Sequence, residues 1–137
     1  MTYTKKTINP TMAIDFTDQV VLVTGAGAGL GYSCAVAFAN AGAKLVVTDI
    51  SREGLDKVVQ ELENSGTEVL GLLNDVTHSS DVNAMLEAIV RRFGRLDIAV
   101  NNAGIATPLQ EFHEVSEAEF DRVMAVNLKG VWLCMQA

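Results

Sequence analysis

Hydrophobic positions along the chain follow two alternating patterns, which predict two kinds of element. Short continuous apolar runs indicate strands buried on both faces, at residues 19–24, 44–49, 68–73 and 96–101. Longer runs with apolar residues every three or four positions indicate helices, at residues 33–41, 51–62 and 82–93. Leu30 and Cys34 extend the apolar face of the first helix, and Gly42 and Gly94 mark helix ends. This alternation is typical of a parallel α/β sheet with helices on both faces.

The strand order follows from the handedness of the connections. Right-handed crossovers predict the order 3-2-1-4, a doubly wound sheet of about four strands with the first strand inside it. The fourth strand would then be an exposed apolar edge. After it, Ser116 and Glu119 have the spacing of a capping box, which opens one further helix. The apolar face of that helix is predicted to hold Phe120, Val123, Met124, Asn127, Val131, Cys134 and Met135.

Composition narrows the class of protein. The 137 residues suit one domain, which we place at residues 15–137, after a flexible polar tail at residues 1–14. No apolar run approaches the ~20 residues that cross a bilayer, and the tail lacks the apolar segment of a secretory signal. A cytoplasmic protein with no membrane contact is therefore expected. A formal charge of −7 argues against nucleic acid as a partner. Cys34 and Cys134 are predicted to be buried free thiols, and no metal site is predicted.

A glycine-rich turn, residues 25–31, joins the first strand to the first helix. A helix N-terminus carries unpaired N–H groups and about half a positive charge, and glycines let a diphosphate approach the backbone. Asp49 ends the second strand, where its carboxylate would accept hydrogen bonds from both ribose hydroxyls of an adenosine. Because the same charge would repel a 2′-phosphate, NAD is expected rather than NADP. Alternatively, Asp49 only caps the following helix.

Four motifs, in the expected order, resemble those of the short-chain dehydrogenase/reductase family. They are Thr24-Gly25-x-x-x-Gly29-x-Gly31 in the turn, Asp75-Val76 after the third strand, Asn101-Asn102-Ala103-Gly104 after the fourth, and Asn127 with Gly130 in the last helix. The resemblance extends from about residue 15 to the end of the chain. It implies a Rossmann-like fold that binds NAD.

The resemblance also implies a role for each residue. Gly25, Gly29 and Gly31 would shape the pyrophosphate turn, which also contains Gly27, with Leu30 near the nicotinamide. Asp75 and Val76 would contact the adenine edge, and Asn102, Ala103 and Gly104 would lie along the adenosine ribose. Asn127 would be the asparagine of the family's catalytic Asn-Ser-Tyr-Lys tetrad, where it positions a water in the proton relay. Its spacing alone equally fits an amide that bonds only backbone and bends the helix.

The serine, tyrosine and lysine of that tetrad have no counterpart in this sequence. Tyr3 and Tyr32 are followed four residues later by Thr7 and Val36 rather than by lysine. The chain is therefore expected to be the N-terminal portion of an NAD-dependent oxidoreductase for a small alcohol or carbonyl substrate, incomplete at its C-terminus and inactive alone. The alternative is a non-catalytic dinucleotide-binding or self-associating module. In either case the exposed sheet edge predicts a homo-oligomer.

Overall fold

The computed structural model describes residues 14–137, so nearly all of the predicted tail lies outside the described residues. Its four strands form one parallel sheet in the predicted order, β3-β2-β1-β4. The elements up to the last strand are β1 (Val20–Thr24), α1 (Gly29–Asn40), β2 (Lys44–Asp49), α2 (Arg52–Asn64), β3 (Val69–Leu73), α3 (Ser79–Phe93) and β4 (Ile98–Val100). The chain continues through η1 (Phe112–Glu114), α4 (Glu117–Met124), the π-helical segment η2 (Ala125–Gly130) and α5 (Val131–Gln136).

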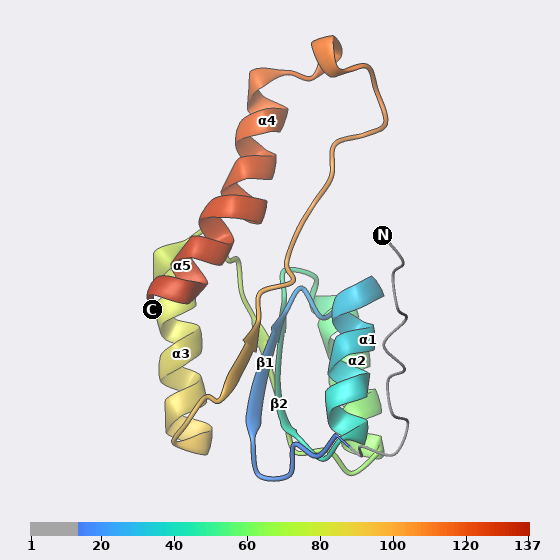
Figure 1. Ribbon diagram of the computed structural model, residues 1–137, viewed down its shortest axis with the longest axis vertical. Helices are drawn as coiled ribbons and strands as arrows, with labels where there is room; N and C mark the ends of the chain where they lie inside the picture. Colours follow the sequence, from blue (N-terminus) through green and yellow to red (C-terminus); the bar gives the residue numbers. More distant parts are fainter. Residues whose placement is uncertain (1–13) are drawn as a thin grey trace, which may run out of the picture.

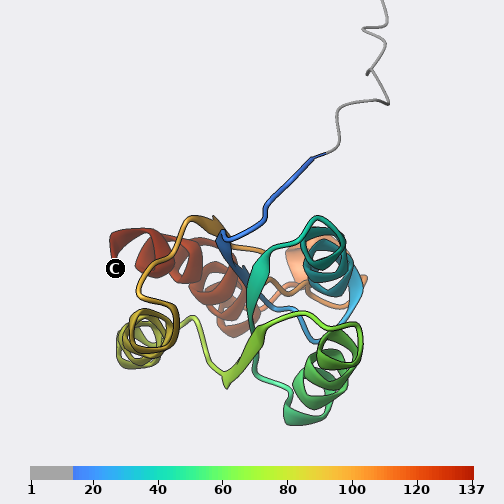
Figure 2. The same ribbon diagram turned by 90° about the horizontal axis from the view of Figure 1, so that it is seen from below.

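Two apolar layers hold the helices against the sheet. Helices α1 and α2 cover one face, and α3 and α5 lie on the other (Figures 1 and 2). Within β1, Val21 and Val23 belong to the first layer, whereas Val20 and Leu22 belong to the second. All of β1 is buried, as its continuous apolar sequence predicts. The carboxyl end of this central strand leads directly into the glycine turn.

The fourth strand, Ile98–Val100, is shorter than the predicted residues 96–101, and other hydrogen bonds replace the strand pattern at its two ends. The Asp97 carboxylate accepts a hydrogen bond from the Val20 N–H at 2.8 Å, in place of a strand partner. Hydrogen bonds from Arg95 and from Val20 hold the pKa of Asp97 below its usual value. At the other end, the Asn102 N–H donates a hydrogen bond to the Val100 carbonyl oxygen at 2.9 Å, which closes a tight turn.

Helix α1 begins earlier than the predicted residues 33–41, at Gly29. Its buried residues are Gly31 and Ala35, which lie one helical turn apart. The prediction that Leu30 lies on the buried face is wrong. With Gly31 and Ala35 against the sheet, Leu30 points outward and is 79% exposed. Cys34 and Cys134 are free thiols, but each is half-buried rather than buried. Burial is enough to raise the pKa of the Cys134 thiol.

The predicted apolar face of the last helix is partly wrong. Phe120 and Met135 are exposed, whereas Leu133, outside the predicted set, is buried against α3 and the sheet. For Leu133 and Met135, which follow it, the π-helical segment between α4 and α5 explains the change. A π-helical turn takes in an extra residue, and one residue corresponds to a rotation of about 100° around a helix. The residues after η2 therefore present a different face from the one that uninterrupted spacing predicts.

Candidate cofactor-binding site

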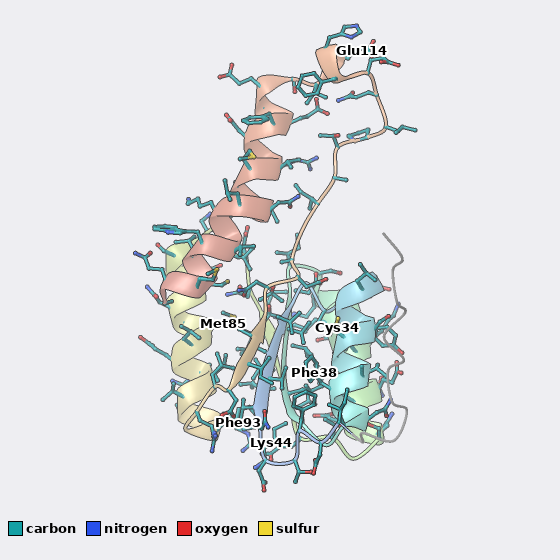
Figure 3. All side chains as sticks on the ribbon, in the orientation of Figure 1. Cys34, Phe38, Lys44, Met85, Phe93 and Glu114 are labelled. Carbon is teal, nitrogen blue, oxygen red and sulfur yellow. The ribbon has the colours of Figure 1, made fainter. Side chains whose placement is uncertain are left out.

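A cavity of about 480 Å³ opens at the carboxyl ends of the strands, beneath the segment formed by α4 and η2. Ligands of doubly wound sheets bind at this edge. Figure 3 shows α4 and the long loop before it rising beyond this edge of the sheet. The residues predicted to bind a cofactor that line the cavity are Gly25, Asp49, Asp75, Val76, Ala103 and Gly104.

The glycine turn is packed closely against its surroundings. A Cβ at Gly31 would overlap the Gly25 carbonyl oxygen and press on the Asn102 amide, so no larger residue fits there. The helix that follows, α1, has no side-chain cap and no acid in its first turn. By contrast, Ser51 caps α2 and the predicted box of Ser116 and Glu119 caps α4. The first N–H groups of α1 are thus left for an anion.

Asn102 and Thr24 tie the turn to the end of β4. The Asn102 side-chain amide donates to the carbonyl oxygens of Thr24 and Gly25, at 2.9 and 3.1 Å. The Thr24 hydroxyl oxygen accepts hydrogen bonds from the N–H groups of Asn102 and Ala103, at 3.0 and 3.1 Å. The sequence assigned no role to Thr24. The available signal was its place as the first residue of the motif in the turn.

The Asp49 carboxylate lies against the glycine turn. Its Oδ2 accepts a hydrogen bond from the Gly27 N–H at 2.9 Å, and its Oδ1 accepts one from the Ser51 N–H at 2.8 Å. The N-cap of α2 is Ser51, whose hydroxyl accepts a hydrogen bond from the Gly54 N–H. Because Asp49 also binds Gly27, its side chain does more than cap this helix. A Cβ at Gly27 would lie 2.8 Å from Oδ2 and displace the carboxylate. Each oxygen retains acceptor capacity for a further donor.

Asp75 follows β3 in a turn closed by Thr77. Burial alone would raise the pKa of Asp75, but hydrogen bonds from the Thr77 N–H and hydroxyl, together with nearby His78, bring that pKa below its usual value. The two Thr77 bonds to Oδ1 measure 2.9 and 2.7 Å. Asp75 therefore presents a fixed negative charge at the cavity.

Val76 and two buried polar residues form the floor of the cavity. Val76 is 6% exposed, and its side chain fills the space where a Cβ at Gly130 of η2 would lie. Thr48 Oγ1 and Asn74 Oδ1 have no hydrogen-bond partner among the described residues. Neither residue was singled out from the sequence. Unpaired buried polar atoms, a carboxylate with spare acceptor capacity and an uncapped helix start together fit the adenosine and diphosphate of a nicotinamide dinucleotide.

Asn127 lies in the π-helical segment and is exposed. Its Oδ1 accepts a hydrogen bond from the Ile105 N–H at 2.9 Å, and its Nδ2 donates to the Ile105 carbonyl oxygen at 2.8 Å. The amide thus bonds backbone within a helix that departs from α geometry. This agrees with the alternative hypothesis for Asn127, an amide that bonds only backbone and bends the helix. These bonds fix the loop after β4, which forms one wall of the cavity. A relay role for Asn127 stays a prediction.

Tyr32 lies on α1 and donates a hydrogen bond to Glu61 at 2.6 Å. This bond raises the pKa of Tyr32, so the phenol is less suited to release a proton.

Within residues 14–137, no group of three or more His, Cys, Asp or Glu residues is placed to hold a metal ion. None of the described helices is both long and apolar enough for a bilayer crossing.

A doubly wound parallel sheet with a glycine turn and an acid after β2 defines a dinucleotide-binding α/β protein. The family model described as short chain dehydrogenase matches residues 19–137. The chain belongs to the short-chain dehydrogenase/reductase family, an oxidoreductase family.

Similar proteins span more sequence than this chain. Levodione reductase of Leifsonia aquatica is 44% identical over 123 residues, which make up 88% of this chain but 46% of the relative. The chain spans about half the length of the curated relatives it matches.

Solved structures share the fold closely. A 3-ketoacyl-(acyl-carrier-protein) reductase from Brucella melitensis, complexed with NADH, has a TM-score of 0.84 and 39% identity over 89% of this chain and 49% of its own. A metagenomic short-chain oxidoreductase in complex with NADP has a TM-score of 0.82 and 34% identity over 89% and 55%. A nicotinamide dinucleotide is therefore the supported class of cofactor.

Proposed function

We propose that this chain is the cofactor-binding portion of an oxidoreductase that transfers a hydride between NAD and a small alcohol or carbonyl substrate. The observation that carries the proposal is the Asp49 carboxylate, held against the glycine turn with acceptor capacity at both oxygens. Bound here, NAD would supply the nicotinamide carbon that accepts or delivers the hydride. The chain's own residues bind and orient it.

The proposed contacts divide along the cavity. The N–H groups of the turn containing Gly25, Gly27, Gly29 and Gly31 receive the diphosphate, and the exposed Leu30 is available to the nicotinamide. Asp49 and the segment Asn102, Ala103 and Gly104 hold the adenosine ribose. Asp75 and Val76 contact the adenine edge. We assign these roles from the residues' positions around the cavity and turn, together with the family resemblance.

Asp49 is also the reason to propose NAD rather than NADP. A carboxylate at the ribose would face the 2′-phosphate of NADP at close range, where like charges repel. The preceding turn carries no basic residue that would offset this repulsion. Similar structures hold either cofactor, so selectivity has to come from local residues of this kind.

Hydride transfer at a hydroxyl also requires a group that moves the hydroxyl proton. Asn127 is proposed to position a water in that relay, from the π-helical segment that its amide joins to Ile105 of the loop after β4. The raised pKa of Tyr32 and its bond to Glu61 make it unsuited to serve as the acid–base group. We therefore propose that the chain of 137 residues binds NADH without turnover.

Calorimetric titration of the purified chain with NADH tests the binding proposal, and an NAD-dependent alcohol oxidation assay tests the absence of turnover. One NADH site and no turnover are expected. A chain that binds no NADH, or that still oxidises alcohols after rigorous purification, contradicts the proposal.

We also propose that the chain self-associates. Four large apolar side chains of α4, η2 and α5 are more than half exposed: Phe120, Leu128, Trp132 and Met135. An exposed apolar surface of this kind favours a partner. Light scattering of the purified chain should give a mass above that of one copy, and the variant Trp132→Lys should lower it. A monomer at all working concentrations would count against self-association.

A further inference from the structure

Among the described residues that line the cofactor cavity, Arg122 is the one Lys or Arg, and none of the contacts proposed above uses it. It lies on α4 and lines the cavity together with Ala125 and Val126. Residues three and four positions apart share one face of a helix, so the three form a single stripe along this wall.

The Arg122 guanidinium forms no ion pair within residues 14–137. Asp121 precedes it in the sequence, and Glu119, one turn earlier on α4, is bonded to Ser116 and Gln110. The cavity's own carboxylates are also bonded, Asp49 by backbone N–H groups and Asp75 by Thr77. Arg122 is therefore a charged group at a ligand cavity that forms no ion pair with the described acidic side chains.

The loop after β2 contributes an apolar counterpart to this cavity. Ile50 lines it with a side chain that is 69% exposed. An exposed isoleucine and a planar guanidinium suit the two faces of a flat aromatic ring. Guanidinium groups are weakly hydrated and stack on aromatic faces, whereas an ammonium group offers only a point charge.

We propose that Arg122 stacks on the adenine ring of the dinucleotide, with Ile50 at the ring's other face, and thereby strengthens cofactor binding. This inference rests on the proposed function, since it requires NAD in the cavity. It makes Arg122 an affinity residue for the adenine end, with no part in the hydride step and no preference for a 2′-phosphate.

The test measures dissociation constants by fluorescence titration with NADH, NADPH and reduced nicotinamide mononucleotide, which lacks adenine. Arg122→Ala should weaken NADH and NADPH by the same factor, about threefold to tenfold, and leave the mononucleotide unchanged. Arg122→Lys should recover only part of the loss, because it keeps the charge without the plane. Lys129→Ala is the matched control, a cation of the same helical stretch that lines a different hollow, and should change nothing.

Three results would overturn the inference while leaving the proposed function intact. One is unchanged NADH binding in Arg122→Ala. Another is a loss confined to NADPH, which would mean that Arg122 pairs with the 2′-phosphate instead. The third is an equal loss for the mononucleotide, which would mean a general disturbance of the site. If the unaltered chain binds no NADH, both proposals fail.

Discussion

The region around β1 and the region after β4 form opposite walls of one cavity, yet they differ in how much of each is buried by other residues of this chain. All of β1 is buried, and the glycine turn is locked by Asn102 and Thr24. The three residues of β4 are half-buried or exposed, and large apolar side chains project from the loop and helix that follow. The turn that would receive the diphosphate is thus fixed by this chain's own contacts. The helix wall depends on fewer and more exposed ones.

The largest effect is expected in the glycine turn. Gly31→Ala would place a methyl group on the Gly25 carbonyl oxygen, and we expect a loss of about 3 kcal/mol in the free energy of unfolding. Gly66→Ala is the control, since only its positive φ, with open space around it, opposes a side chain, at about 1 kcal/mol. Urea unfolding followed by circular dichroism compares them. Equal losses would mean that the turn is looser than described.

The next effect concerns the link between turn and β4. Asn102→Ala leaves the carbonyl oxygens of Thr24 and Gly25 without a side-chain donor in a partly buried site, which should cost about 2 kcal/mol. NADH binding should weaken with it, because the turn loses its support. Urea unfolding and an NADH titration measure the two effects. A stability loss with unchanged NADH affinity would separate the link from the site.

A smaller effect is expected on the opposite wall. Asn127→Ala removes two exposed hydrogen bonds to Ile105 and should cost about 1 kcal/mol. The loss should be local, so hydrogen exchange should quicken at the Ile105 amide while the amides of β1 stay protected. Should β1 exchange faster as well, the two walls would be one cooperative unit and the contrast between them would not hold.

The smallest effect is a change in titration. Thr77→Val removes the hydroxyl bond to Asp75, so the pKa of Asp75 should rise toward its usual value. A carboxyl with a lowered pKa stabilises the fold above its unfolded-state pKa, and this contribution disappears as the pH falls through the folded-state value. The variant should therefore lose less stability on acidification. Carbon NMR of the carboxyl groups measures the shift, and Asp15, held in a similar way by Thr17, should not move. A Thr77→Val chain with an unmoved Asp75 pKa would remove the hydroxyl as a cause.

Periodicity predicted the sheet because β1 and β2 are buried on both faces, where sequence and burial agree closely. It failed where other forces decide. The Asp97 carboxylate replaces a strand bond at β4, and the π-helical turn around Asn127 rotates the face of α5. Asp49, Asp75 and Ala103 were expected at the site and do line the cavity. Arg122 was not expected there, because an arginine on a helix has no local signal that distinguishes a cavity wall from a solvent-facing surface.

Coenzyme selectivity tests the central claim most directly. Dissociation constants for NADH and NADPH would be measured on the unaltered chain and on Asp49→Ala. We expect the unaltered chain to bind NADH at least about tenfold more tightly, since charge-assisted bonds to the ribose contribute about 1.5 kcal/mol or more. In Asp49→Ala the preference should largely disappear. A chain that binds NADPH as well as NADH, or a preference that survives the loss of Asp49, would contradict the account.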